Sequence, residues 1–353
     1  MSEILQQLVN EVALDRYLTA HMAEYAAVAA AKLVIERVSA GHSNETFVIH
    51  KGPHQWVLRR PPLGPLLPTA HDVIREFRML SGLINTNVPV PRPLLSCEDT
   101  TVLGAPFYLM ARVDGVVIRS HVPPPFADPA TRLELTRALV QNLVRLHAVD
   151  WQAAGLAGLG KPTGYLERQL RRWSDQLERA HTRAIPELDA VTVWLGANLP
   201  VSPLATIVHG DYRIDNVMYA QALPVQLVAT LDWEMATLGD PLADLGYMLS
   251  FWREPGDPPF PIQGDLGQVT TEPGFPTRAV VIQMYAEMSG REVDPRQMAF
   301  YTALAVWKLA ILLEGSYTRH LAGTTDDPYF ELMREGVPAL GRRALGICQG
   351  QET

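Results

Sequence analysis

The stretch IVHGDYRIDNVMY, residues 207–219, places a group of polar side chains between two apolar runs. Asp211 and Asn216 lie five positions apart within it. The next apolar run, LVATL, starts at residue 227 and ends directly before Asp232. A single Asp or Asn between strands is most often a turn residue. Three such oxygen-bearing side chains at this spacing call for a chemical explanation.

Phosphoryl transfer from a nucleotide needs a carboxylate near the acceptor hydroxyl and oxygen ligands for the magnesium ions that neutralise the phosphates. One loop and one adjacent strand end can supply all three groups. In this interpretation Asp211 meets the acceptor hydroxyl, Asn216 offers its amide oxygen to the metal, and Asp232 bridges the metal to the phosphates.

The composition is that of a folded globular protein. The chain has 353 residues, 47% of them hydrophobic and 19% charged, which favours two domains and argues against disorder. Its net charge of −8 argues against a nucleic-acid or anionic-membrane partner, because both favour clustered Lys and Arg. The partner we expect is a small molecule that carries a hydroxyl group.

The remaining global signals agree with a cytoplasmic protein. The chain has two cysteines, Cys97 and Cys348, and no CxxC pair, so neither a disulfide framework nor a zinc cluster is predicted. The opening residues lack the apolar core and cleavage site of a signal peptide. The longest apolar run, AFYTALAVWKLAILL, is interrupted by Lys308 and is too short to span a bilayer.

The pattern changes from strand to helix near residue 112. Residues 32–62 alternate β-rich runs with turn residues and predict three consecutive antiparallel strands. A helix is predicted over 68–83, with Thr69 as its cap, and further strands at 90–95 and 107–111. Beyond residue 112 the apolar residues repeat at helical spacing, so we predict domains 1–111 and 112–353.

These motifs resemble the aminoglycoside phosphotransferase family, a branch of the protein-kinase-like fold. HGDYRIDN followed by LDWEMATLGDP is similar to the catalytic loop and metal-binding segment of that family, especially in the phosphotransferase domains associated with acyl-CoA dehydrogenases. The resemblance runs from SAGHSNETF through most of the chain. It implies an α+β, bilobal fold, with a small antiparallel-sheet N-lobe and a larger, mainly helical C-lobe, and ATP, or GTP, with Mg²⁺ as cofactors.

The same resemblance assigns GHSNETF to a hairpin that covers the nucleotide phosphates. Gly41, Ser43 and Asn44 would supply a backbone that approaches them closely. A plain hairpin turn explains the Gly and the Asn equally well.

In WVLRR, relatives often carry a phosphate-binding Lys where this chain has Arg. Arg59 is the candidate, because it follows Val57 by two positions, and Arg60 would point to the other face. The change matters, since guanidinium is a planar fork and ammonium a point charge. Glu76 lies beside the apolar stripe of its predicted helix and is the expected partner of that cation.

FYLMARVDG resembles the connection between lobes, where adenine bonds to main chain. Met110 would line the pocket, and the backbone of Ala111 and Val113 would offer an acceptor and a donor. Arg213 stands where kinases place a cation near the transferred phosphate, and a structural ion pair is an equal alternative.

Other polar residues are assigned supporting roles. His209 is expected to orient the loop, Asp240 to cap a helix, Glu234 to support the metal ligands, and Asp215 to be a solvated turn residue.

The leading hypothesis is an ATP- and Mg²⁺-dependent kinase that phosphorylates a hydroxyl of a small molecule. The acceptor would be a hydroxyacyl or acyl-CoA-like compound, or an aminoglycoside-like one, although no dense acidic run suits a polycation. The candidates for the acceptor side are Arg172, Glu314, Tyr317 and Arg319. The alternative is a catalytically silent nucleotide-binding switch module, suggested by the Arg in place of Lys.

Overall fold

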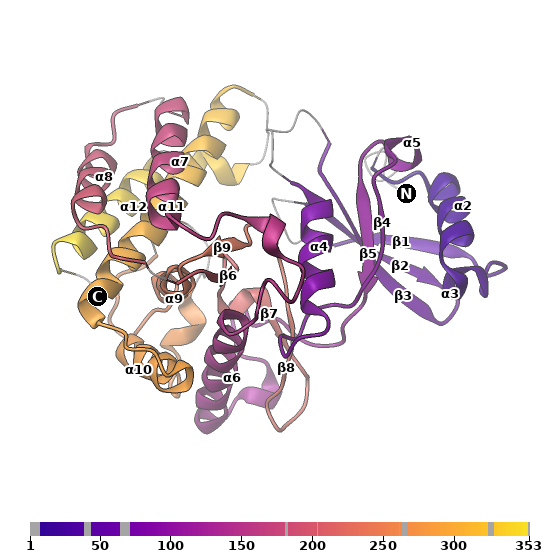
Figure 1. Ribbon diagram of the computed structural model, residues 1–353, viewed down its shortest axis with the longest axis horizontal. Helices are drawn as coiled ribbons and strands as arrows, with labels where there is room; N and C mark the ends of the chain where they lie inside the picture. The colour runs from indigo at the N-terminus through magenta and orange to yellow at the C-terminus, as the bar shows by residue number, and fades with distance from the viewer. Residues whose placement is uncertain are drawn as a thin grey trace. The chain divides into compact units, whose positions relative to one another are not determined.

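The computed structural model forms two compact units, drawn in Figure 1. It describes residues 8–38, 44–63, 71–180, 183–202, 204–260, 262, 267–323 and 328–351. Unit 1 comprises residues 1–114, 152–159 and 229–234, and unit 2 comprises residues 115–151, 160–228 and 235–353.

Unit 1 is discontinuous, which differs from the predicted pair of continuous domains 1–111 and 112–353. Its first segment ends at Asp114, and two later segments join it. Packing explains both additions. The Leu156 side chain would lie 2.4 Å from a Cβ at Gly82, and the Thr230 N–H donates to the Pro89 carbonyl at 2.8 Å. A sequence pattern cannot reveal that residues 152–159 and 229–234 pack against the first segment of unit 1.

A five-stranded antiparallel sheet, in the order β1-β2-β3-β5-β4, is the centre of unit 1. The three consecutive strands predicted over residues 32–62 are confirmed, while the strand predicted at 90–95 lies at 93–97. The strands are β1 (Leu33–Arg37), β2 (Glu45–Lys51), β3 (His54–Arg60), β4 (Pro93–Cys97) and β5 (Phe107–Ala111).

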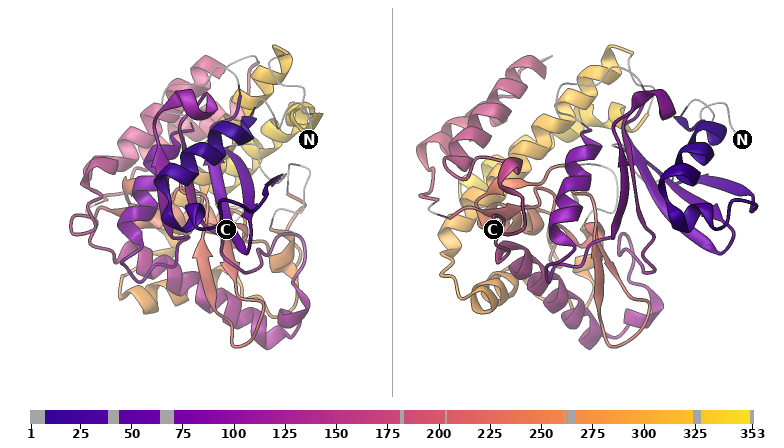
Figure 2. Two further views of the ribbon diagram at one scale, coloured as in Figure 1. Left: turned by 90° about the vertical axis from the view of Figure 1, so that its right-hand side faces the viewer. Right: turned by 45° about the vertical axis from the view of Figure 1, so that its right-hand side comes forward.

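Helices cover both faces of this sheet (Figures 1 and 2). Leu14 and Leu18 of α2 (Glu11–His21) share a core with Phe47 and Ile49 of β2. The opposite face carries α4 (Val73–Leu83), which packs on β4 and β5. The remaining short helices of unit 1 are α3 (Ala23–Ala26), α5 (Thr100–Leu103) and η2 (Ala157–Leu159).

The start of α4 differs from the prediction. Asp72 is its N-cap, with its side chain accepting from the Arg75 N–H at 2.9 Å, whereas Thr69 lies outside the described residues. An aspartate satisfies the exposed N–H groups of a first turn as well as a threonine does. The buried face of α4 includes Glu76 among apolar residues.

Unit 2 is mainly helical and has its own core, in which α9, α11 and α12 pack together. Two short sheets, β6-β9 and β7-β8, position the polar loop of residues 209–216. The helices are α6 (Pro129–His147), α7 (Tyr165–Ala180), α8 (Pro186–Ala197), α9 (Pro241–Ser250), α10 (Arg278–Ser289), α11 (Pro295–Leu321) and α12 (Met333–Cys348). The strands are β6 (Thr206–Val208), β7 (Val217–Tyr219), β8 (Leu227–Thr230), whose last two residues belong to unit 1, and β9 (Thr237–Gly239). The 3₁₀ turns are η1 (Pro124–Phe126), η3 (Ile214–Asn216), η4 (Gln268–Thr271) and η5 (Pro328–Leu332).

Helix α11 is longer than the apolar run suggested. In the described part of the chain it is the one helix whose length and composition would allow it to cross a membrane, and 72% of its most apolar window is buried inside the structure. Burial of this kind is typical of the central helix of a folded core. The predicted α+β class, with an antiparallel sheet and a mainly helical part, is confirmed.

Candidate functional site

Two side chains of the loop after β6 form a tight pair within unit 2. The Asn216 amide nitrogen Nδ2 donates to Asp211 Oδ2 at 2.7 Å and to the Asp211 carbonyl at 2.8 Å. Because the NH₂ group faces these acceptors, the Asn216 carbonyl oxygen Oδ1 points elsewhere and keeps its lone pairs. The predicted carboxylate and the predicted metal ligand are thus brought together, with the ligand oxygen available.

Arg213 forms ion pairs with two carboxylates of the same loop. Its Nε lies 3.2 Å from Asp211 Oδ1, its Nη1 lies 3.0 Å from Asp215 Oδ2, and its guanidinium stands 5.0 Å from the centre of the Phe251 ring. The structural ion pair weighed from the sequence is therefore present. Contact of Arg213 with a transferred phosphate stays a prediction.

The interpretation of Asp215 as a solvated turn residue is wrong. Its side chain is only 17% exposed. Burial raises the pKa of its carboxyl above the ordinary value, and the Arg213 cation opposes that change. The missed signal was Arg213 two positions earlier, a cation placed to neutralise both Asp211 and Asp215.

Asp244 of α9 fixes the start of the loop, a role that was not predicted from the sequence. Its fully buried carboxylate accepts the backbone N–H of His209 at 2.7 Å and of Gly210 at 2.8 Å, and lies 3.3 Å from His147 Nε2. Gly210 has φ 84°, and a Cβ there would lie 2.7 Å from the Met235 carbonyl oxygen. A carboxylate within the apolar helix PLADLGYML was the available signal.

We predict that Asp244→Asn destabilises the protein and slows phosphotransfer. One carboxylate oxygen becomes an NH₂ group, which cannot accept an N–H, so a buried donor loses its partner at a cost of about 2–3 kcal/mol. Urea unfolding and a turnover assay measure the two effects.

Asp240 caps the Leu242 N–H at 2.8 Å as predicted, but it is buried and also accepts the Tyr301 hydroxyl. The control is therefore Asp294→Asn, where an exposed side chain caps the Arg296 N–H at 2.9 Å at the start of α11. Asn caps as well as Asp, so a change below about 1 kcal/mol is expected. Equal losses in both variants would contradict this role for Asp244.

His209 has the kind of supporting contact expected of it, whereas the supporting role of Glu234 beside the metal ligands stays a prediction. The His209 ring accepts the Asp211 N–H at 3.3 Å and is fully buried. In unit 1, Glu234 accepts from the Asn44 side-chain amide at 3.5 Å.

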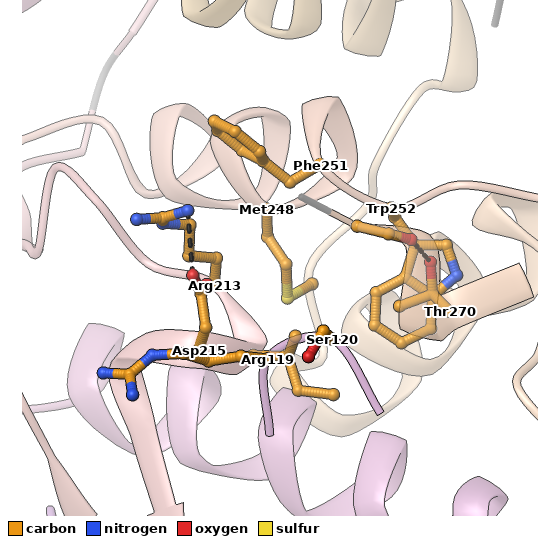
Figure 3. A pocket seen from close by; sticks show the side chains of 10 residues that line it. Arg119, Ser120, Arg213, Asp215, Met248, Phe251, Trp252 and Thr270 are labelled. Carbon is orange, nitrogen blue, oxygen red and sulfur yellow. Dashed lines mark hydrogen bonds and ion pairs between the residues drawn. The ribbon is translucent and has the colours of Figure 1, made fainter. Parts of the chain in front are cut away.

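A cavity of about 280 Å³ lies in unit 2 beside Arg213 (Figure 3). Met248 points toward its middle, with the Arg213 and Asp215 side chains on one side and Trp252 and Thr270 on the other. Its walls are formed by Arg119, Ser120, Arg213, Ile214, Asp215, Met248, Phe251, Trp252, Gly267 and Thr270. The volume approaches the lower end of small-molecule sites, about 300 Å³.

Within unit 1, Arg59 joins two acidic side chains. Its Nη1 lies 2.9 Å from Glu76 Oε1 and its Nη2 lies 3.4 Å from Asp232 Oδ1. Although burial alone would lower the pKa of the Arg59 guanidinium, the negative charges around it, Glu76 first, raise it above the ordinary value. Burial acts to raise the pKa of Glu76, and Arg59 acts against it. The expected partnership of Arg59 and Glu76 is therefore present.

Arg60 points away from this group, as predicted from strand alternation. Its guanidinium donates to the carbonyl oxygens of Leu8 and Leu103 and is buried. Arg59, and not Arg60, is thus the arginine that meets the acidic pair of Glu76 and Asp232.

We predict that Arg59→Met costs about 3–5 kcal/mol of unfolding free energy, because it leaves the buried Glu76 carboxylate without a counter-charge. The double variant Arg59→Met with Glu76→Met should recover much of that loss, since no buried charge remains. The control is Arg37→Met on the same sheet, where an Arg 44% exposed pairs with Glu45 at 2.7 Å and about 1 kcal/mol or less is expected. Urea unfolding of wild type, Arg59→Met, Glu76→Met, their double variant and Arg37→Met measures this. A double variant as unstable as the sum of its single variants would refute the pairing argument.

Asp232 has an uncommon backbone conformation. Its φ is 61°, in the left-handed region that Asp tolerates better than most residues. Its neighbours are fixed, since the buried Trp233 indole donates to the Thr230 carbonyl at 3.0 Å. Residues held in this region concentrate at functional sites.

The remaining predicted nucleotide contacts have mixed outcomes. Gly41 and Ser43 lie outside the described residues. Met110 and Ala111 end β5, and the Ala111 N–H already donates to the Arg92 carbonyl at 2.8 Å, which agrees with Ala111 acting through its carbonyl. Val113 follows β5 and is half-buried. Their contacts with adenine stay predictions.

Three acceptor-side candidates have structural partners, and their contact with an acceptor stays a prediction. The buried Glu314 carboxylate pairs with Arg183 at 2.8 Å, and the Arg183 guanidinium stands 4.7 Å from the centre of the Tyr317 ring. Arg319 donates to the Ser316 hydroxyl at 3.0 Å. Arg172 lies exposed beside Trp173.

The predicted metal ligands fit Mg²⁺ by their chemistry. Asn216 and Asp232 offer only oxygen atoms, and Mg²⁺ is commonly held by one or two carboxylates plus phosphates and water. Among the described residues no cluster of three or more His, Cys, Asp or Glu side chains could form an all-protein metal site. Because Asn216 belongs to unit 2 and Asp232 to unit 1, their joint ligation stays a prediction.

Comparison with known families now decides the classification. The model of the phosphotransferase enzyme family, APH, matches residues 34–274. The chain belongs to this family. It is therefore a phosphotransferase, and the resemblance expected from HGDYRIDN and LDWEMATLGDP is confirmed.

Relatives of this APH chain include human acyl-CoA dehydrogenase family member 11, which is 35% identical over 99% of the chain. The chain spans only 44% of that protein's length. A solved protein of Ralstonia eutropha assigned to the aminoglycoside phosphotransferases is 30% identical, with a TM-score of 0.79, over 96% of this chain and 98% of that one. A thermostable mutant of aminoglycoside phosphotransferase APH(4)-Ia, in a ternary complex with AMP-PNP and hygromycin B, shares the fold at 14% identity, with a TM-score of 0.61 over 97% and 100% of the two chains.

Proposed function

We propose that the chain transfers the γ-phosphoryl group of ATP to a hydroxyl of a small molecule in the presence of Mg²⁺. The observation that carries this proposal is the Asp211–Asn216 pair at 2.7 Å, a fixed carboxylate next to an amide oxygen available for metal. Membership of the APH family supports it, as does the binding of an ATP analogue by a structural relative.

The residues would act through positioning and charge, which are the main contributions of enzymes to phosphoryl transfer. Asp211, held by Asn216 and Arg213, keeps lone pairs that can accept the hydroxyl hydrogen of the acceptor. Arg59 would contact the phosphates in an orientation fixed by Glu76. Asn216 Oδ1 and Asp232 would hold Mg²⁺, which when bound neutralises the phosphate charge.

For the acceptor we favour a hydroxyacyl or acyl-CoA-like compound. Relatives that are acyl-CoA dehydrogenase family members support this class. The cavity beside Arg213 supports it too, because Ile214, Met248, Phe251 and Trp252 give it apolar walls that suit a hydrocarbon chain. An aminoglycoside-like acceptor is the second candidate.

A catalytically silent nucleotide-binding module remains the competing function, motivated by Arg59 in place of a Lys. The paired Asp211 and Asn216 argue against it, since nucleotide binding alone has no need of a carboxylate placed for an acceptor hydroxyl.

The decisive experiment offers the purified chain ATP or GTP, Mg²⁺ and separate acceptor classes: hydroxyacyl-CoA thioesters, free hydroxy acids and aminoglycosides. Mass spectrometry and ³¹P NMR would detect a phosphate monoester together with the nucleoside diphosphate. We expect a product from one acyl class. Nucleotide binding without a product from any class would favour the silent module.

A further inference from the structure

Lys308 is a lysine placed among the central helices of unit 2, and no function has been assigned to it so far. It lies on α11, and its ammonium stands 5.5 Å from the centre of the Trp173 ring and 5.9 Å from the centre of the Tyr247 ring. Trp173 comes from α7 and Tyr247 from α9, so three helices meet around this amine. Contacts with ring faces use the charge of an ammonium group but leave its N–H donors available.

The carboxylates whose charges reach Lys308 are occupied by other donors. These are Asp244 and Asp211. Asp244 accepts two backbone N–H groups, and Asp211 accepts from Asn216 and Arg213. Within the described ranges, no carboxylate forms an ion pair with Lys308. A desolvated cation without a partner is costly, and such groups are concentrated at binding sites.

Two further observations concern the surroundings of this amine. Burial, and after it the charge of Asp211, raises the pKa of the Tyr247 hydroxyl, so Lys308 stands over a ring that the proposed catalytic carboxylate reaches electrostatically. The Arg172 guanidinium stands 5.7 Å from the centre of the Trp173 ring, next to the same indole, and its charge also reaches Lys308. Two cations, Lys308 and Arg172, thus share the Trp173 side chain.

We infer that Lys308, with Arg172, binds a negatively charged group of the acceptor, a carboxylate or a phosphate, and holds the acceptor hydroxyl toward Asp211. This inference rests on the proposed function and specifies the charge of the acceptor. Lys308 and Arg172 would favour an anionic acceptor and repel a polycationic one. Lys308 is a binding and positioning residue in this scheme, and Asp211 remains the group that meets the hydroxyl.

The test compares probes that differ in one charge. 3-Hydroxyoctanoate is paired with its primary amide, and glycerol 3-phosphate with glycerol, so that the carboxylate and phosphate cases are separated. Each probe is measured as an acceptor with ATP and Mg²⁺, and as a ligand by calorimetry without nucleotide. The proteins are wild type, Lys308→Met, Lys308→Arg, and the control Lys161→Met, which removes an exposed lysine of the same unit.

We expect wild type to prefer the charged member of at least one pair. Lys308→Met should lower kcat/KM for that member about 10- to 100-fold, mainly through KM, because a hydrogen bond to a charged group is lost. The neutral member should change little, Lys308→Arg should restore part of the preference, and Lys161→Met should behave as wild type. A purely structural lysine would affect both members equally.

The outcomes separate the two proposals. Turnover without a charge preference in wild type, or an equal loss for both members in Lys308→Met, overturns the role of Lys308 and leaves the phosphotransfer proposal standing. Absence of turnover with every acceptor counts against the proposed function, and calorimetry then decides the inference alone. If wild type binds neither charged probe more tightly than its neutral partner, the inference is wrong.

The charge preference should also depend on pH. Burial lowers the pKa of the Lys308 ammonium from 10.5 to about 8, with Asp244 and Asp211 opposing the shift and Arg172 adding to it. The preference for the charged probe should therefore fade as the pH rises through about 8, and it should not do so in Lys308→Arg. The unfolded chain binds more protons than the folded chain between pH 8 and 10.5, so wild type should gain stability relative to Lys308→Met across that window.

Discussion

Asp211→Asn is expected to reduce the turnover number of phosphotransfer by about a thousandfold, within the range typical of a lost general base. The variant keeps the size of the side chain, but one of the two oxygens becomes an NH₂ group, so either Asn216 or Arg213 loses its acceptor on this residue. It cannot take up or orient the hydroxyl hydrogen of the acceptor as a carboxylate does. Nucleotide affinity should stay within a few-fold of wild type, because Asp211 has no assigned role in binding the nucleotide.

The measurement is single-turnover phosphotransfer with an acceptor that wild type accepts, combined with calorimetric titration of ATP. Asp175→Asn is the control, since it removes an exposed carboxylate from α7 in the same unit. If Asp211→Asn had the turnover number of wild type, Asp211 would have no role in the mechanism. Loss of nucleotide binding together with turnover would point to a collapsed loop instead.

Asp232→Asn is expected to raise the Mg²⁺ concentration needed for half-maximal activity by about a hundredfold or more, since even outer-shell changes at metal sites commonly cost 10- to 100-fold. Asn also tolerates a positive φ, so the conformation at 61° should persist while the carboxylate is lost. The pair formed by Arg59 and Glu76 should persist as well, because its 2.9 Å contact does not involve Asp232.

Titration of Mg²⁺ in the turnover assay measures this effect. Glu234→Gln is the comparison, because it removes a second carboxylate of the same segment whose expected role is supporting. The Glu234 variant should shift the Mg²⁺ dependence by clearly less than the Asp232 variant. If Glu234→Gln shifted the Mg²⁺ dependence more than Asp232→Asn did, Glu234 would be the metal ligand and Asp232 the supporting residue.

Much of this architecture was predictable because its signals are local. The strands of residues 32–62 follow from alternation and turn chemistry, and the helical character beyond residue 112 follows from apolar residues at helical spacing. Asp211 and Asn216 are five residues apart, so one loop necessarily brings them near each other. Arg59 could be distinguished from Arg60 by its position two residues after Val57, and strand alternation then turned Arg60 to the other face.

What escaped prediction depends on contacts between distant residues. Asp244 lies 34 residues beyond Gly210, and only the fold shows that its carboxylate meets that N–H. Asp215 looked solvated because a loop position gives no information on the packing around Arg213 and Phe251. Lys308 looked like an interruption of an apolar run, and its position between Trp173 and Tyr247 depends on three helices meeting.

The discontinuity of unit 1 has a consequence for how the protein is made. A ribosome delivers residues 1–114 first, and at that stage Glu76 can already neutralise Arg59. Asp232, the second acidic neighbour of Arg59, arrives only after more than a hundred further residues have been synthesised. The first unit therefore cannot be completed until much of the second has emerged, which links the maturation of the two during translation.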